Sequence, residues 1–144
     1  MKKFFLILVL CTGSTIIFAQ QNWNRRNPPA AVQRSWKKDF PGRDNDAWEW
    51  KNNHWRARYK DRDHNDRNVD VFYDKYGRRR YSQTEWDRND LPERVQNRIR
   101  SRYRTNNYSA YRIERPSGGF YFQITLGNNR SVYLDNQGRE TTHY

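Results

Sequence analysis

The chain has 144 residues, and its 28 lysines and arginines against 16 acidic residues give it a formal net charge of +12. Its single cysteine excludes an intramolecular disulfide. Aromatic residues make up 16% of the chain, so tryptophan, tyrosine and phenylalanine have to supply much of the core, and we predict a folded domain rather than a disordered basic one.

The first nineteen residues have the order of a secretory signal peptide. Lys2 and Lys3 precede an apolar stretch, and Ala19 stands before a polar chain, at the expected cleavage site. Residues 12–15 interrupt the apolar run, which falls short of the roughly 20 residues of a membrane span. We predict a periplasmic or secreted mature chain, residues 20–144, with no transmembrane helix. Because it is exported, we do not expect nucleic acid as its partner, although it keeps a formal charge of +10 (12 − 2).

A first helix is predicted from residue 28 to residue 40. Asn27 is expected to cap it, two prolines suit its first turn, and Pro41 ends it. One face is apolar, with Val32, Trp36 and Phe40. The hydrophobic period then changes from about 3.6 to 2, which indicates strands. The residues expected on their apolar faces are Trp48 and Trp50, then Trp55, Ala57 and Tyr59, then Val69, Val71 and Tyr73.

A second helix is predicted to begin at Pro92, where Asp90 and Glu93 have the spacing of a capping box. Its apolar face consists of residues at every fourth position: Leu91, Val95, Ile99 and Tyr103. Strands follow again, and their apolar positions are Tyr111 and Ile113, then Phe120, Phe122, Ile124 and Leu126, then Val132 and Leu134.

The second set of elements repeats the first. Residues 92–103 align with residues 29–40 at an offset of 63 (92 − 29), and VYLDNQG aligns with VFYDKYG at an offset of 61 (135 − 74). We predict one domain in residues 20–144, built of two repeats at about 28–84 and 90–144. The predicted fold class is α+β: a tandem repeat of two helix-plus-antiparallel-strand units that form a sheet with both helices packed on one face.

Each repeat ends in an Asp-x-x-Gly sequence, with Asp74 and Gly77 in the first and Asp135 and Gly138 in the second. Aspartate at the first position of a turn accepts backbone hydrogen bonds, and glycine at the fourth supplies a positive φ. A catalytic carboxylate would need a partner acid or histidine at a repeating position, and none recurs. We therefore interpret both sequences as turns.

No catalytic or cofactor-binding constellation is found, and we predict that the chain is not an enzyme and has no cofactor. Asp61 to Asp66 begins like a calcium-binding loop, but Asp66 and Phe72 stand where that loop needs glycine and glutamate. A hairpin turn is the favoured interpretation, with weak calcium binding as the alternative. His54, His64 and His143 are not spaced as metal ligands, so no metal site is predicted.

Two groups of residues are candidates for binding a partner. Arg94, Arg98 and Arg102 recur at every fourth position of the second helix, on a different face from Val95 and Ile99. Like charges at this spacing repel, so they favour either an anionic partner or a solvated basic face. The second group is aromatic and is either core or a protein-binding surface on an uncovered face of the sheet. It consists of Trp48, Trp50, Trp55, Tyr59 and Trp86.

The order of helix, strands and Asp-x-x-Gly turn, given twice behind a signal peptide, resembles the PepSY-like, beta-lactamase-inhibitor-like exported proteins of Bacteroidetes. The resemblance spans about residues 28–140 and is carried by DAWEW, HWRARY, VFYDKYG, LPERVQNRI, GFYFQITL and VYLDNQG. It implies a single PepSY-like domain of tandem α+β units. Related domains in protease propeptides and in a beta-lactamase inhibitor imply binding and inhibition of another exported protein, but no inhibitory residue can be carried over.

We predict a non-enzymatic module that binds another exported or envelope protein through the open aromatic face of its sheet, with inhibition of an exported enzyme as one form of that binding. The alternative function is binding of an anionic envelope polymer, either lipopolysaccharide or an acidic polysaccharide, through the arginines of the second helix. A catalytic function would need residues that the sequence does not place together.

Overall fold

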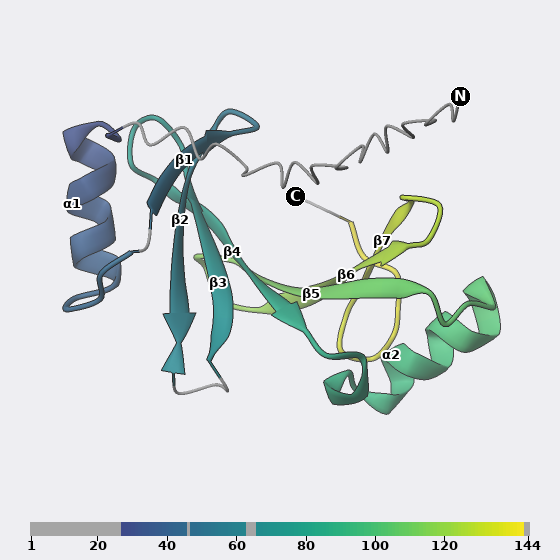
Figure 1. The fold of residues 1–144 in the computed structure, drawn as a ribbon. Coiled ribbons are helices and arrows are strands. Elements are labelled where there is room, and N and C mark those ends of the chain that lie inside the picture. Colours follow the sequence, from purple (N-terminus) through teal and green to yellow (C-terminus); the bar gives the residue numbers. More distant parts are fainter. Residues whose placement is uncertain (1–26, 46, 63–65, 143–144) are drawn as a thin grey trace, which may run out of the picture.

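The computed structural model describes residues 27–45, 47–62 and 66–142. One antiparallel sheet holds seven strands in chain order (Figure 1). The strands are β1 (Ala47–Lys51), β2 (His54–Asp61), β3 (Arg67–Tyr73), β4 (Arg79–Trp86), β5 (Tyr108–Glu114), β6 (Phe120–Leu126) and β7 (Ser131–Leu134). The helices are α1 (Ala30–Asp39), the short η2 (Arg88–Asp90), α2 (Glu93–Arg98) and its π-helical continuation η3 (Ile99–Tyr103). The α+β class is as predicted.

None of the helices in the described part of the chain combines the length and the apolar character that a membrane span requires. Each of the two longer helices instead covers one end of the sheet, α1 at β2–β3 and α2 with η3 at β5–β7 (Figure 1). Two separate apolar cores result. The core under α1 contains Val32, Trp36, Trp55, Ala57, Tyr59, Val69, Val71 and Tyr73. The core under α2 contains Leu91, Val95, Ile99, Ala110, Phe122, Ile124, Leu126, Val132 and Leu134.

The strand register places both cores on the same face of the sheet. One row of directly paired residues runs across the strands from Tyr59 through Val69, Thr84, Arg112 and Phe122 to Leu134. Residues that pair directly across antiparallel strands point to the same side. The row begins in the first core and ends in the second, so both helices cover one face, which we call the core face. No described helix covers the opposite face, which we call the open face.

Strand β4 was not predicted, although it lies at the centre of the sheet and pairs with both β3 and β5. Its core-face residues Ser82 and Thr84 lie between the two cores, opposite Glu114 and Arg112. Because no described helix packs on this part of the face, polar side chains are tolerated there, and the strand lacks the apolar alternation by which strands are recognised in a sequence.

The predicted apolar helix faces are confirmed, but both predicted caps are wrong. Pro29 and Pro92 occupy the N-cap positions, and neither helix has a side-chain cap. A glutamine one turn into each helix makes a different contact, back to the residue before the N-cap. Gln33 Nε2 donates to the carbonyl of Pro28, and Gln96 Nε2 donates to that of Leu91, both at 2.8 Å.

The interpretation of both Asp-x-x-Gly sequences as turns is confirmed. One carboxylate oxygen of Asp74 accepts the amides of Tyr76 and Arg78, at 2.9 and 3.0 Å, and the other accepts Nε of Arg78 at 2.8 Å. Asp135 repeats this pattern with Gln137 and Arg139, at 2.8 and 2.9 Å for the amides and 2.8 Å for Nε. Both aspartates therefore hold the backbone of a turn and are not free for catalysis.

The two aspartates give the fold a pH dependence. Partial burial acts to raise the pKa of Asp135, but the hydrogen bonds from the Arg139 amide, the Arg139 side chain and the Gln137 amide outweigh it, and the pKa lies below its ordinary value. The pKa of Asp74 is lowered in the same way. A carboxyl group with a lowered folded-state pKa contributes stability above its unfolded pKa, and that contribution is lost as the pH falls through the folded value.

We expect the free energy of unfolding to fall on acidification below about pH 4, where aspartate in an unfolded chain takes up a proton. Asp135→Asn should be less stable than the natural chain at neutral pH, and the difference should shrink as the pH falls. Urea unfolding across this pH range measures it. A difference that stays constant from neutral to strongly acid pH would contradict the assignment.

Candidate functional site

The aromatic residues predicted to line the open face lie on the core face instead. Trp48 pairs with Ala57, Trp50 with Trp55, and Trp86 with Ala110. Each of these pairs includes a member of one of the two cores. The prediction that this aromatic group forms the open face of the sheet is therefore wrong. The two-residue turn at 52–53, with φ of 49° and 62°, fixes the register of this hairpin and puts both tryptophans of β1 on the helix side.

The packing of these aromatic side chains explains their number. Trp55 and Tyr59 are buried in the core under α1. Trp48 is half-buried against Trp36, with ring centroids 5.9 Å apart. Trp86 is half-buried against Phe122 at 6.2 Å. These four are mainly core residues, whereas Trp50, at the edge of the sheet, is 39% exposed.

The predicted arginine stripe is tied to the C-terminal turn. Arg94 donates to the side-chain oxygen of Gln137, and Nε of Arg98 donates to the carbonyl of Gly138 at 2.9 Å. Nε of Arg102 lies 2.8 Å from a carboxylate oxygen of Glu140. The charge of Arg102 is therefore balanced within the chain by a direct ion pair, whereas the other two arginines bond to neutral oxygens.

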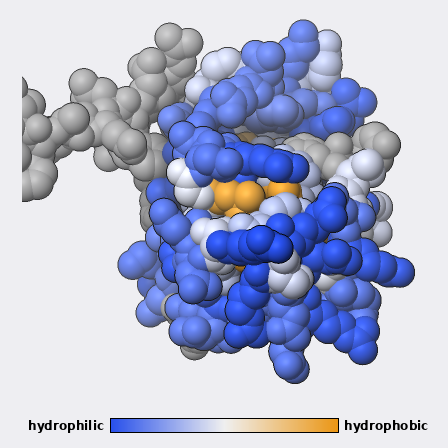
Figure 2. Space-filling view, turned by 90° about the vertical axis from the view of Figure 1, so that its right-hand side faces the viewer, coloured by the Kyte–Doolittle hydropathy of each residue, from blue (hydrophilic) through white to orange (hydrophobic). Residues whose placement is uncertain are grey.

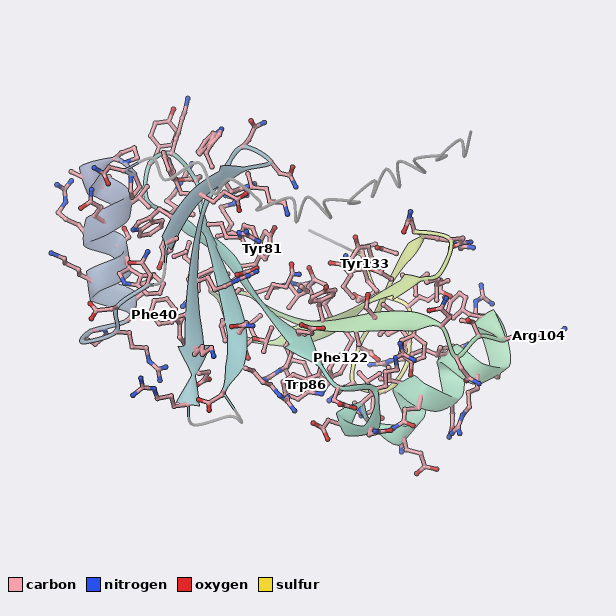
Figure 3. The ribbon with its side chains drawn as sticks, viewed as in Figure 1. Phe40, Tyr81, Trp86, Arg104, Phe122 and Tyr133 are labelled. Carbon is pink, nitrogen blue, oxygen red and sulfur yellow. The ribbon has the colours of Figure 1, made fainter. Side chains whose placement is uncertain are left out.

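The open face carries a different aromatic group, which we call the tyrosine face. It consists of Tyr81 on β4, Tyr111 on β5, Tyr121 on β6 and Tyr133 on β7. The register puts all four on one side. Tyr111 and Tyr133 both pair directly with Gln123, and Tyr121 lies two residues before Gln123 on the same strand. Tyr81 lies two residues before Gln83, which pairs with Ile113, the partner of Tyr121. Figure 3 shows Tyr81 and Tyr133 on the upper side of the strands, with Trp86 and Phe122 on the lower side.

Ring contacts hold three of the four residues of the tyrosine face. Tyr81 stacks on the buried Phe72 with ring centroids 4.4 Å apart, and Tyr121 meets Tyr133 edge-on at 5.8 Å. Burial raises the pKa of Tyr81, and its neighbours Tyr121 and Asp70 raise it further. The phenol is therefore neutral at physiological pH and can donate a hydrogen bond. Tyr81, Tyr111 and Tyr133 are each half-buried, so part of each side chain lies at the surface, whereas Tyr121 is buried.

Paired charges lie in the floor beside the tyrosine face. The buried Asp70 accepts from Nη1 of Arg56 at 3.1 Å and from Nε and Nη2 of Arg58 at 2.6 and 2.9 Å. Arg56 also forms an ion pair with Glu49. Two positive and two negative groups balance in this network. Such hydrogen-bonded pairs fix side-chain positions, so the neighbouring rings rest on a preorganised floor.

The strand alternation of the sequence contains a signal for the tyrosine face, although these residues were not among the predicted binding residues. Assigning Phe120, Phe122, Ile124 and Leu126 to the core face leaves Tyr121 and Gln123 on the other side of β6. The same alternation in β7 leaves Tyr133 opposite to Val132 and Leu134. Tyr81 had no such signal, because its strand was not predicted.

The chemistry available at the tyrosine face is that of binding. Its tyrosine side chains combine apolar contact with hydrogen bonding, and tyrosine is enriched in antibody binding surfaces for this reason. Within the described residues, no group of three His, Cys, Asp or Glu side chains could hold a metal ion. Of the loop that resembled a calcium site, residues 63–65 lie outside the described residues, as do His64 and His143, while Asp61 lies 3.6 Å from Arg43 in an ion pair.

No protein-family model matches the chain, and no curated protein matches its sequence. Solved structures do match its fold. A DUF2874 family protein from Bacteroides ovatus is similar over 81% of this chain and 86% of its own, with a TM-score of 0.68 and 21% identity. A protein from Bacteroides eggerthii, whose name suggests a periplasmic location, has a TM-score of 0.66 and 18% identity over 81% and 88% of the two chains.

A third match is a BLIP-like protein from Bacteroides fragilis, with a TM-score of 0.64 and 21% identity over 83% of this chain and 86% of its own. At such identities the likeness shows the fold alone. These neighbours fit the predicted resemblance to beta-lactamase-inhibitor-like proteins of Bacteroidetes, while the PepSY part of that resemblance stays a prediction. The chain thus shares an α+β fold with DUF2874-family and BLIP-like proteins of Bacteroides.

Proposed function

We propose that this chain is an exported, non-enzymatic module that binds another exported or envelope protein against its tyrosine face. The observation that carries the proposal is that three half-buried tyrosines, Tyr81, Tyr111 and Tyr133, lie with the buried Tyr121 on a face that no described helix covers, beside a floor of paired charges. Tyrosine supplies contact area and a hydrogen-bonding group at a low cost in conformational entropy. The BLIP-like name of one structural neighbour supports inhibition of an exported enzyme as the form that this binding takes.

Three further features belong to the same proposal: a signal peptide cleaved after Ala19, a periplasmic or secreted location, and one PepSY-like domain of two repeats. The name of the Bacteroides eggerthii neighbour supports the location. The matching glutamine contacts at Gln33 and Gln96, and the matching bonds of the two Asp-x-x-Gly turns, support the repeats.

The test of this function compares two tyrosines of the face with one outside it. The mature chain, residues 20–144, is used as bait in periplasmic extract, and the retained protein is purified and titrated against variants. We expect Tyr81→Ala and Tyr133→Ala each to weaken binding about tenfold or more, as central aromatic residues of an interface do. Tyr76→Ala is the control, because Tyr76 is 65% exposed on the turn whose Gly77 packs against α1, a helix of the core face.

The control should bind as the natural chain does. Equal binding by all three variants would contradict a role for the tyrosine face, and the absence of any specifically retained protein would count against the function itself. Circular dichroism of each variant separates a lost contact from a lost fold.

A second candidate function is binding of an acidic envelope polymer through α2. What supports it is the formal charge of the chain, +12 over all residues, together with Arg94 and Arg98, which bond to neutral oxygens. Arg102 is no longer part of this candidate site, because Glu140 balances its charge.

A further inference from the structure

A shallow hollow of about 630 Å³, open to solvent, lies between α2 with η3 and the C-terminal Asp-x-x-Gly turn. Its lining combines arginine, amide and hydroxyl side chains. They are Arg94, Asn97, Arg98, Arg100, Ser101 and Gln137, and Gly138 completes the wall. Figure 2, which views the molecule from the side where α2 and β7 lie in Figure 1, shows a mostly hydrophilic surface around a small apolar depression. A ligand on this side would therefore meet mainly polar side chains around that depression.

Among the residues that the structure describes, the lining of the hollow has three guanidinium groups and no carboxylate. Within the described residues, each of the three donates to a neutral oxygen: Arg94 to Gln137, Arg98 to the carbonyl of Gly138, and Arg100 to Asn97 at 2.6 Å. The neighbouring arginines differ, because Arg102 pairs with Glu140 and Arg139 with Asp135. The described lining of the hollow thus carries positive charge with no acidic group of its own. Glu140, a carboxylate outside the lining, interacts with it, since the pKa of Glu140 is lowered by the hydrogen bond from Tyr103 and by the charges of Arg102 and Arg98.

The walls of the hollow are held in place before any ligand arrives. Gly138 approaches α2 so closely that a Cβ atom built on it would lie 2.6 Å from the carbonyl oxygen of Arg94. Asp135 fixes the turn from the other side through its bonds to Gln137 and Arg139. Preorganised donors lose less entropy on binding, which favours recognition of a small charged group.

The first Asp-x-x-Gly turn provides an internal comparison. Gly77 approaches α1 in the same way, with a built Cβ 2.7 Å from the carbonyl oxygen of Ala31 and 3.0 Å from the hydroxyl of Ser35. Ala31 and Ser35 take the places that Arg94 and Arg98 have beside the second turn. The two turns share their backbone contact, but only the second has arginines on the adjoining helix positions.

We propose that this hollow binds a compact oxyanion, a phosphate or sulfate group. Guanidinium groups pair with such anions through two parallel hydrogen bonds, and the amide and hydroxyl groups of the lining can satisfy the remaining oxygens. The group is either free phosphate or an ester carried on a polymer. If the group is an ester on a polymer, the proposal rests on the second candidate function, the binding of an acidic envelope polymer, and deepens it. It does not depend on protein binding at the tyrosine face.

Inorganic phosphate is titrated into the ¹⁵N-labelled mature chain at physiological salt, and the amide resonances are followed by NMR. We expect saturable shifts at Gly138 and Gln137, with Gly77 unchanged. Calorimetry gives the affinity and the stoichiometry of one. Arg94→Gln and Arg100→Gln should each weaken binding roughly tenfold, because each removes a charge-assisted bond.

Arg104→Gln is the matched control, since it removes one positive charge from the residue that follows η3, and that residue does not line the hollow. It should leave the affinity within about twofold. Dextran sulfate is the second probe, and it distinguishes free phosphate from an ester carried on a polymer. If the chain binds dextran sulfate but not inorganic phosphate, and the variants keep the same ranking, the site is assigned to an ester on a polymer.

Two outcomes would overturn the proposal. One is the absence of shifts at Gly138 with both probes at millimolar concentration. The other is an equal loss of affinity in all three variants, which would mean diffuse attraction to a basic surface. The tyrosine-face variant Tyr81→Ala should bind phosphate normally, so failure here and failure of protein binding can be told apart.

Discussion

Replacing Trp36 by alanine should lower the free energy of unfolding by about 3–5 kcal/mol, the range for truncating a large aromatic residue in a core. Trp36 is buried, stacks on Phe40 with ring centroids 4.6 Å apart and meets Tyr59 edge-on at 5.8 Å. Its indole Nε1 also donates to the carbonyl of Arg43 at 3.1 Å, which fixes the chain after α1. The truncation removes all of these contacts, and urea unfolding of the mature chain measures the loss.

Trp50→Ala is the control for this experiment. Trp50 is 39% exposed on an edge strand, and its one described ring contact is with Trp55 at 5.2 Å. We expect a loss of about 1 kcal/mol, because surface positions contribute little to stability. If Trp36→Ala and Trp50→Ala lowered the free energy of unfolding by similar amounts, the packing of α1 on the core formed with β2 and β3 would be contradicted.

Replacing Gly138 by alanine should cost about 2–5 kcal/mol, the sum of a conformational and a steric penalty. The φ angle of Gly138 is +73°, where a side chain is strained, and its Cβ would meet the backbone oxygen of Arg94 at 2.6 Å. A backbone atom of a packed helix cannot move aside as a flexible side chain can. The variant should therefore loosen the C-terminal turn from α2, and thermal unfolding should show the loss.

Gly42→Ala separates the two penalties. Gly42 has nearly the same φ, +74°, but a Cβ built on it would have nothing within 4 Å. It should lose only the conformational part, about 1–2 kcal/mol. Equal losses at the two positions would show that the close approach of the turn to α2 contributes nothing.

The tryptophans and tyrosines show which features a sequence pattern can predict and which it cannot. The alternation of apolar residues predicted the core positions of β2, β3 and β6, because it depends only on the two-residue period of a strand. The exception is Phe120, which is 38% exposed. In β5 the prediction was wrong, because Tyr111 and Ile113 lie on the open face. Which face remains open is a different question, since it depends on where the helices pack. The aromatic residues expected there lie under or beside the helices, and the tyrosine face takes their place.

The arginines of α2 make the same point for charge. Their helical spacing predicted correctly that they share a side away from Val95 and Ile99, which are buried. It could not show that Glu140, far along the chain, neutralises Arg102, while Arg100 joins the hollow instead. Ion pairs between distant segments depend on the docking of the C-terminal turn, and no local pattern encodes that docking.

The sequence by itself determined the α+β class, the apolar faces of both helices and the role of the two Asp-x-x-Gly turns. Those features follow from local periodicity and turn chemistry, whose range is a few residues. The tertiary structure alone decided that β4 joins the two halves into one sheet, that the open face carries tyrosines, and that three arginines surround one hollow. These arrangements depend on strand register and on contacts between residues far apart in the chain, which a single sequence does not specify locally.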